Sequence, residues 1–470
     1  MMVAGVLLAP PLARAQAADP DIESIRRSLG DALSFATFGM IDGLGPDAQV
    51  TRDGDAYRIH LPVTGLTATS APAVTAIARP ADNGAWDVGP LTFPSTATID
   101  SHSPAGGAVT YSLGKQDITA HIVPDMKQPT TYTARFGDIR LESESDKHRA
   151  RQTIATYSVK GTLIADGEGR LAMTTTGDAT DWAMTTLPEH GPGMDFLAKR
   201  LGVNASVQGL DRAKMEHLRG RLHGLVAVLP KAGKLPGPSA TAPRDTLNAM
   251  LDDLTGLMTR FQVDETIEGV KISGQGMQAG AGTVIIGMHG DTADQKLDAG
   301  IDLAVNDLTV PKSVPAAYIP YVPKHISLRN RVRGLPTDEV VALLRAALAE
   351  NANPVVLEAQ ALHLLSTPNA RVSIDPFSFD AGPLAVTGTA RLLASENGGF
   401  AGRIHIIASG VDATITRAQG NPAFGQIVPM LYLAKGMGKP DGASLVWDID
   451  VDERGIRING TPFGHPPPKR

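Results

Sequence analysis

Short runs in which apolar and polar residues alternate are the dominant pattern along the chain. The clearest run covers residues 297–305, and the runs 57–63 and 445–452 have the same period. A period of two is typical of β-strands that bury one face. Gly455 separates the third run from a short fourth one, so the sequence predicts a β-hairpin over 445–460. Because the alternation is one-sided, we expect antiparallel sheets with one solvent-exposed face.

Helical spacing occurs in fewer places. Apolar residues recur every three or four positions in residues 22–40, 247–261, 340–348 and 410–437, and we predict helices there, with breaks at the prolines of the last segment. We also interpret the block 192–230 as two helices. It leads into a stretch rich in Pro, Gly and Ser, which is typical of a linker or exposed loop.

These elements predict an α+β fold that is dominated by curved antiparallel sheets in two lobes, with amphipathic helices covering them. Gly161, Gly274, Gly388 and Gly460 recur in one short phrase, apolar-x-Gly-x, and glycine inside a strand usually marks a bulge or bend. The expected order is a signal peptide (1–17), a first strand-rich lobe with an N-terminal helix (18–187), a helical middle (188–262) with a linker at 230–244, a second strand-rich lobe (263–464) with helices near 336–350 and 410–437, and a tail (465–470).

The N-terminus predicts export. Residues 3–13 are apolar but too short to span a bilayer, which takes about 20 residues. Ala15 and Ala17 then supply the small residues that signal peptidase requires, and cleavage after Ala17 would leave Ala18 as the mature start. No Lys or Arg precedes the apolar run, and we expect the basic region of the signal to lie upstream of Met1. We therefore expect a periplasmic protein without internal membrane spans.

Composition narrows the chemistry. The chain has 470 residues, no cysteine and only 11 Phe, 7 Tyr and 3 Trp. Disulfides, Cys-ligated metal sites and cysteine nucleophiles are therefore excluded. The net charge of −6 gives no general attraction for phosphate backbones, so we expect no nucleic-acid partner. With so few aromatic residues, stacking on sugars or bases is poorly supported, and flexible acyl chains are the better candidate ligand.

Two short motifs match catalytic or cofactor patterns without their required context. Ser112 and Lys115 have Ser-x-x-Lys spacing, but they lie between strand-like segments, whereas that chemistry needs a helix start. Residues 274–279 fit Gly-x-Gly-x-x-Ala, but the chain continues into a turn and another strand where a dinucleotide site needs a helix. We interpret this segment as a glycine-rich hairpin.

The candidate metal ligands are equally weak. His217 and His223 are six residues apart on an expected helix, which is not the spacing of a zinc pair. His289 and Asp291 are near neighbours, which we interpret as a solvated loop pair. The alternating residues Asp448, Asp450 and Asp452 suit either calcium binding or a soluble edge strand, and we favour the edge strand. We therefore predict no catalytic residue, no cofactor site and no metal site.

The C-terminal quarter carries a resemblance. The run from Gly410 through Asn421 and residues 431–438, followed by 445–449 and 458–460, resembles the end of a bacterial family catalogued as a domain of unknown function, number twenty-one twenty-five. The strand-rich character is more loosely similar to AsmA-type envelope proteins, which are associated with lipid handling between two membranes. Neither resemblance carries catalytic residues onto this chain.

The expected function is therefore that of a non-enzymatic protein of the cell envelope. It is expected to bind a lipid-like ligand or to support envelope assembly, with a lipid or an envelope protein as partner and with peripheral membrane contact. A purely structural interaction module of the periplasm is the alternative, and an unrecognised hydrolase is a third reading, because one sequence does not reveal residues that converge from distant segments.

Overall fold

The structure of the chain is a computed structural model. It describes residues 20–36, 48–62, 66–67, 73–100, 108–126, 128–144, 148–166, 169–188, 191–228, 241–349, 352–368, 370–394, 400–452 and 455–463. The predicted signal peptide, most of the predicted linker and the predicted tail lie outside these residues.

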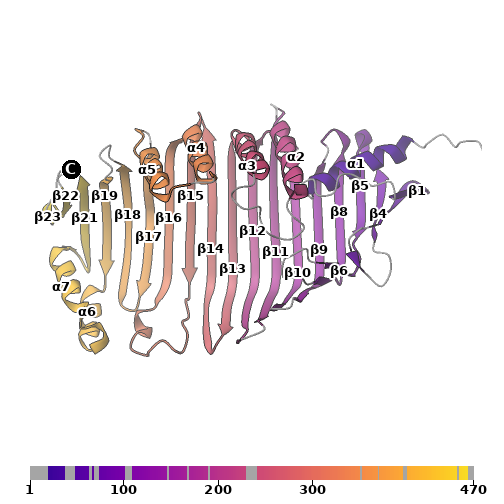
Figure 1. Ribbon diagram of the computed structural model, residues 1–470. Helices are drawn as coiled ribbons and strands as arrows, with labels where there is room; N and C mark the ends of the chain where they lie inside the picture. The colour runs from indigo at the N-terminus through magenta and orange to yellow at the C-terminus, as the bar shows by residue number, and fades with distance from the viewer. Residues whose placement is uncertain are drawn as a thin grey trace, which may run out of the picture.

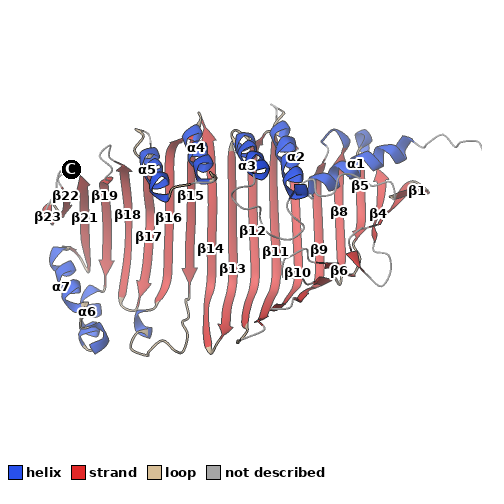
Figure 2. Cartoon of the chain, viewed as in Figure 1, coloured by secondary structure: helices blue, strands red, loops and turns tan. Residues whose placement is uncertain are grey.

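One large open antiparallel sheet makes up most of the protein, which is 60% strand and 24% helix (Figures 1 and 2). Each strand from β9 to β19 pairs with the next one in the chain, and β19 pairs with β21. These strands are β9 (Gln128–Glu144), β10 (His148–Ala165), β11 (Leu171–Pro188), β12 (Met194–Leu210), β13 (Arg260–Gly274), β14 (Met277–Ala293), β15 (Lys296–Asn306), β16 (Pro323–Pro336), β17 (Arg371–Ala381), β18 (Leu384–Ala394), β19 (Phe400–Ser409) and β21 (Ser444–Asp452).

Shorter strands continue the sheet at both ends. At the C-terminal end β21 pairs with β20 (Lys439–Asp441) and β22 (Gly455–Ile458), and β22 pairs with β23 (Thr461–Phe463). On the other side, the N-terminal part of β9 pairs with β8 and its C-terminal part with β7. Two series of paired strands therefore lead to β9. The first is β1 (Gln49–Asp53), β2 (Ala56–Pro62), β4 (Ala73–Pro80), β5 (Trp86–Thr92) and β8 (Gln116–Val123). The second is β3 (Leu66–Thr67), β6 (Thr96–Asp100) and β7 (Ala108–Ser112).

The helices lie at the ends of the strands (Figure 2). Those at the upper end in Figure 1 are α1 (Pro20–Ala36), α2 (Arg212–Val228), α3 (Thr241–Leu254), α4 (Thr337–Ala347) and α5 (Pro354–Leu365). At the opposite end are α6 (Val411–Gln419) and α7 (Val428–Met437), and the 3₁₀ turns are η1 (Asp82–Gly84), η2 (Pro124–Met126), η3 (Ile319–Tyr321) and η4 (Pro422–Phe424). Helices α1 and α4 are clearly amphipathic, whereas α5 and α7 are apolar around most of their circumference.

Three buried clusters hold the helices to the sheet. Under α1, Ile25 and Leu29 pack against Tyr57 and Trp86 of the N-terminal strands. The second cluster joins α2 to the ends of β10, β11 and β12, and the third joins α4 and α5 to β15 and β16. The second and third clusters sit near chain connections, where α2, α4 and α5 lie between consecutive long strands, whereas α1 precedes the first strand. The core is therefore distributed along one margin of the sheet.

The predicted strands and helices are largely present, but the predicted lobes are not. Strands β15 and β2 and the hairpin of β21 and β22 lie where alternation predicted them. The two strand-rich segments form one sheet, because β12 pairs with β13 over most of its length. The prediction of two lobes with covering helices is therefore not confirmed.

Two helix predictions were wrong in their extent. The block 192–230 contains one helix, α2, because residues 194–210 form strand β12. The helix predicted over 247–261 ends at Leu254, and Phe261 lies in β13. Gly256, which has a φ of 68°, lies just after that helix end and adopts a conformation that other residues avoid.

A row of residues with left-handed backbone crosses the sheet, and we call it the αL row. It consists of Asp138, Asp181, Gly269 and Asp307, whose φ angles are 52°, 50°, 63° and 53°. They lie on alternate strands at the same level, because the pairing registers align them through Ala155, Lys199 and Gly282 on the strands between. No residue is inserted on either strand of these pairs, so the row is distinct from a β-bulge.

The apolar pattern of the strands changes phase at the αL row. Successive apolar positions are three residues apart there instead of two, as in the pairs Phe136/Ile139, Ile154/Tyr157, Ala179/Trp182, Ala198/Leu201, Ile267/Val270 and Ala281/Val284. A positive φ interrupts the regular alternation of strand side chains. We interpret the phase change as compensation that keeps apolar side chains on one face across the row. The three-residue step also explains why β12 has a helix-like spacing in the sequence.

Glycines within the strands make room for aromatic rings. Gly161 lies directly opposite Tyr132, and Gly388 lies directly opposite Phe377. A Cβ atom on either glycine would be 2.4 Å from the ring of its partner. The pairing of Gly161 is regular, so the predicted bulge is absent there. Beside Gly388 the register of β17 and β18 does shift, between Ile374 and Phe377. Each ring lies over its glycine. Gly274 ends a strand and Gly460 lies in a turn with a φ of 80°.

Candidate ligand-binding face

One face of the sheet is apolar from β9 to β22. Residues that oppose each other directly share a face, so the pairing registers trace three rows across it, which end at Leu445, Trp447 and Ile449 of β21. The central members of these rows are Leu201, Val203, Ile267, Val263, Val284, Ile286, Met288, Ile301, Leu303, Val305, Ile326, Leu328, Ile374, Phe377, Phe379, Ile404 and Ile406. We call this surface the apolar face; Glu265 and Asn330 are polar members of its rows.

The helices pack on the apolar face. The cluster under α2 contains Met173 and Val207. These two residues belong to a further row, which runs beside the row of Val263 and Met288. The cluster under α4 and α5 contains Val332 of β16, which belongs to that further row. At the other end the indole Nε1 of Trp447 donates a hydrogen bond of 2.9 Å to the Ala434 carbonyl of α7. Helices therefore line the apolar face at both ends of its strands.

Between these helices the apolar face is open to solvent. Met288, Ile301 and Leu303 expose 42%, 55% and 39% of their surface, although they lie in central strands. Most other members of the three rows are half-buried rather than buried. A soluble monomer seldom leaves a large contiguous apolar surface uncovered, and such surfaces usually contact a ligand, a membrane or another protein. The open part of the apolar face is therefore the candidate site.

The opposite face of the same strands is polar. Cross-strand pairs of opposite charge recur on it, such as Arg331 with Asp302 at 2.5 Å and Arg260 with Asp291 at 2.7 Å. Opposed threonines also hydrogen-bond to each other there, as Thr162 and Thr174 do at 2.6 Å. Paired charges and hydroxyls suit a surface that remains in water. The sheet is thus two-sided, with its three continuous apolar rows on one side and mainly polar pairs on the other, where single aliphatic residues such as Ile285 are exposed.

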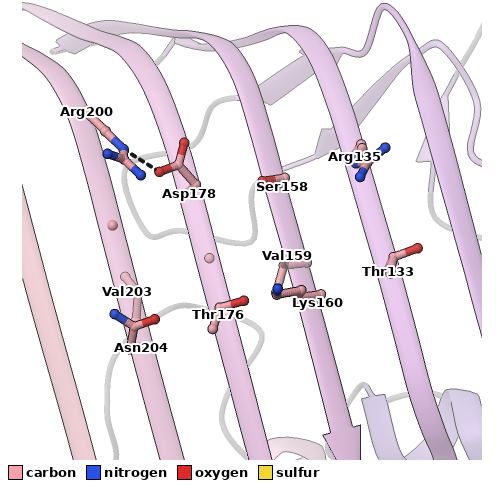
Figure 3. Close-up of a pocket in the computed structure, with 12 residues that line it drawn as sticks. Thr133, Arg135, Ser158, Val159, Lys160, Thr176, Asp178, Arg200, Val203 and Asn204 are labelled. Carbon is pink, nitrogen blue, oxygen red and sulfur yellow. Dashed lines mark hydrogen bonds and ion pairs between the residues drawn. The ribbon is translucent and has the colours of Figure 1, made fainter.

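A shallow depression of about 380 Å³ lies on the polar face over β9 to β12 (Figure 3). It forms because Gly202 leaves a gap between Arg200 and Asn204 on the same strand. Arg200 donates a hydrogen bond of 2.6 Å to Asp178, and this bond raises the pKa of the guanidinium above its usual value. Arg135 and Lys160 also line the depression, which is therefore mainly cationic.

One histidine on the polar face has a shifted pKa. Burial lowers the pKa of His289, and the nearby Arg331 cation lowers it further. The hydrogen bond from Arg331 lowers the pKa of Asp302. At neutral pH the imidazole of His289 is therefore uncharged and the carboxylate of Asp302 is charged. Asp302 forms an ion pair with Arg331, and His289 and Asp302 are not a poised acid and base.

The structure also locates the motifs that the sequence singled out. Ser112 ends β7 and Gln116 begins β8, so the Ser-x-x-Lys spacing spans a strand connection. Residues 274–279 form the predicted hairpin, with Gln275 and Gly276 at φ 53° and 76°, as a type I′ turn requires.

The metal-ligand candidates are dispersed. His289 and Asp291 lie on strand β14, so the prediction of a loop pair was wrong. The Nδ1 atom of His217 is 4.0 Å from Asp253, whereas the side chain of His223 lies outside the described residues. Among the described residues, no group of three His, Asp or Glu side chains is arranged to hold a metal ion.

The three alternating aspartates of β21 each contact a basic side chain. Asp448 contacts His405 at 2.8 Å, Asp450 contacts Arg403 at 3.0 Å, and Asp452 contacts Arg457 at 2.7 Å. Strand β21 has neighbours on both sides, so the prediction of an edge strand was wrong. The carboxylates form cross-strand ion pairs on the polar face.

Comparison with models of known protein families matches no family, and neither the curated proteins nor the solved structures contain a match to this chain. In the part of the chain that the structure describes, no helix has the length and apolar character needed to cross a bilayer.

Sequence reasoning anticipated the chemistry of the candidate site but not its position. Alternation marked Ile301 and Leu303 as members of an apolar strand face, and low aromatic content indicated an aliphatic surface. It did not show that this face is shared by every strand from β9 to β21, because the pairing of distant strands decides that. It also gave no signal that the helices would stop at the strand ends.

Proposed function

We propose that this protein is an exported, non-enzymatic component of the bacterial cell envelope that binds acyl chains on the apolar face. The observation that carries the proposal is the uncovered aliphatic surface between two groups of helices, centred on Met288, Ile301 and Leu303. Its periplasmic location rests on the predicted signal peptide, and its place in the envelope on the loose similarity of its strand-rich character to AsmA-type envelope proteins.

The composition of the apolar face favours a flexible aliphatic ligand. Its open part is lined by Ile, Leu, Val and Met, whereas the rings of Tyr132 and Phe377 lie over opposed glycines. A flat aliphatic surface makes dispersion contacts with a methylene chain in many positions and does not require a single orientation. Polar groups that would specify a sugar or a base are concentrated on the other face.

The apolar area that an acyl chain could bury sets how such a chain must be bound. Each methylene that is fully removed from water contributes about 0.8 kcal/mol, so about ten methylenes that are half covered contribute about 4 kcal/mol. Association costs at least a comparable amount, because the ligand loses translational and rotational freedom. Useful affinity therefore requires that a chain be covered on more than one side. The exposed aliphatic side chains of α4 and α3, such as Leu344 and Leu254, are available at the margin for this purpose.

Native mass spectrometry of the gently purified full chain tests the proposal. We expect bound species whose mass corresponds to acyl lipids, released by mild activation. The alternative, a structural module that acts through protein contacts, predicts lipid-free protein that also fails to bind an added fatty acid. That combined result would reject the proposal.

A further inference from the structure

A second exposed apolar surface lies at the end of the strands opposite α2 to α5. Helix α7 exposes three aliphatic side chains in steps of one helical turn, namely Ile427, Met430 and Leu433, at 42%, 68% and 57%. Tyr432 is exposed beside them at 48%. The only charged residue of α7 is Lys435, which is bound to Asp412 of α6. A helix surface this apolar is unusual for a side that faces water.

The loop before β16 extends this surface. Tyr318 and Ile319 expose 39% and 52% of their surface. The rings of Tyr318 and Tyr321 contact Phe424, which precedes α7, with ring centroids 5.1 Å and 4.4 Å apart. The side-chain amide of Asn421 also donates a hydrogen bond of 3.1 Å to the Ala317 carbonyl. Two segments that are distant in sequence thus form one unit, which we call the α7 patch: Tyr318, Ile319, Ile427, Met430, Tyr432 and Leu433.

The charge around the α7 patch is opposite to that of the whole chain. Residues 307–324 and 410–441 contain five basic residues (Lys312, Lys324, Arg417, Lys435 and Lys439) and three acidic residues (Asp307, Asp412 and Asp441), a net charge of +2. The complete chain has a net charge of −6. Tyrosine is concentrated here as well, since three of the seven tyrosines are Tyr318, Tyr321 and Tyr432. Exposed aliphatic residues with tyrosines and surrounding cations match the depth profile of an anionic bilayer surface.

We propose that the α7 patch docks the protein onto the surface of a bilayer that contains anionic lipids. Met430 and Leu433 enter the boundary between headgroups and acyl chains, the tyrosines lie at headgroup level, and the basic residues contact lipid phosphates. Helix α7 is joined to the apolar face by the hydrogen bond between Trp447 and Ala434 and by the close approach of Gly438 to the Trp447 ring. Docking therefore places one end of the apolar face next to the membrane, which deepens the proposed acyl-chain function.

Vesicle co-sedimentation of the full-length chain tests this docking. We expect binding to vesicles of phosphatidylcholine mixed with phosphatidylglycerol, and weaker binding to phosphatidylcholine alone or at high salt. The double variant Met430→Asp/Leu433→Asp should bind mixed vesicles at least about tenfold more weakly, because it replaces the inserting side chains by anions. Both side chains are exposed, so circular dichroism should show an unchanged fold.

A matched control lies at the other end of the strands. Val355 and Val356 of α5 expose 72% and 49% of their surface, and Val355→Asp/Val356→Asp should bind vesicles as the unchanged protein does. Failure of the unchanged chain to bind mixed vesicles, or equal losses in the two double variants, would overturn the docking proposal. Binding of a soluble fluorescent fatty acid is measured in parallel. The α7 variant should retain it, so the docking proposal and the acyl-chain proposal can fail separately.

Discussion

The sharpest test of the apolar face compares two isoleucines on adjacent central strands. Ile301 of β15 lies on the apolar face opposite Met288, and Ile285 of β14 lies on the polar face opposite Ala304. Their exposed fractions are 55% and 38%, so both tolerate a polar replacement. Ile301→Asp places a charge on the proposed binding surface, and Ile285→Asp places the same charge on the other side of the same sheet.

The expected loss follows from the exposed area of Ile301. Full burial of an isoleucine side chain is worth about 1.5–3 kcal/mol, so covering the 55% that is exposed is worth about 0.8–1.7 kcal/mol. Truncation by Ile301→Ala should therefore weaken acyl-chain binding by about four- to fifteenfold. Ile301→Asp should cost at least as much, because the ligand would also desolvate a carboxylate. Ile285→Asp should change the affinity less than about twofold.

The assay is titration with a polyene fatty acid whose emission rises in apolar surroundings. Circular dichroism and the midpoint of thermal unfolding verify that both variants keep the fold. If Ile301→Asp binds as tightly as the unchanged protein, or if Ile285→Asp loses as much affinity, the apolar face is not the binding surface.

Three further predictions concern the sheet itself. Gly161→Ala should lower the free energy of unfolding by about 1–3 kcal/mol, because its Cβ would lie 2.4 Å from the Tyr132 ring. The control is Gly177→Ala on the next strand, where a Cβ meets nothing closer than 3.8 Å. Equal losses of stability in urea unfolding of the two variants would contradict this. Asp181→Val should lower the free energy of unfolding by about 1–2 kcal/mol, because φ is 50° at this position, whereas Asp181→Asn should leave it nearly unchanged. Equal urea midpoints for the two variants would contradict this. The hydrogen bond from Arg331 lowers the pKa of Asp302, so its stabilisation is complete above the unfolded-state pKa of about 4 and is lost as pH falls through the lower folded-state value. The stability difference between the unchanged protein and Arg331→Gln should accordingly be constant above about pH 5 and shrink in more acidic solution, and a difference that grows on acidification would refute the assignment.

Local patterns in the sequence predicted most single elements because their causes are local. Alternation over residues 297–305 follows from one buried and one exposed face, whatever strands lie beside them. The hairpin at Gln275 and Gly276 depends only on residues that accept positive φ. The prediction of two helices over 192–230 was wrong for an informative reason. At the level of the αL row the apolar phase of β12 shifts by one residue, and this shift looks like helical spacing.

The sequence by itself determined that the chain folds mainly into one-sided antiparallel strands, that its apolar surface is aliphatic, and that disulfides are absent. Only the tertiary structure decided that these strands join into one open sheet and that the helices leave Met288, Ile301 and Leu303 exposed. It also placed the ring of Phe424, just before α7, against Tyr318, more than a hundred positions away. The physical reason is that side-chain alternation is fixed within one strand. The choice of neighbouring strands, and therefore which apolar area stays uncovered, depends on the free energy of the whole packed chain.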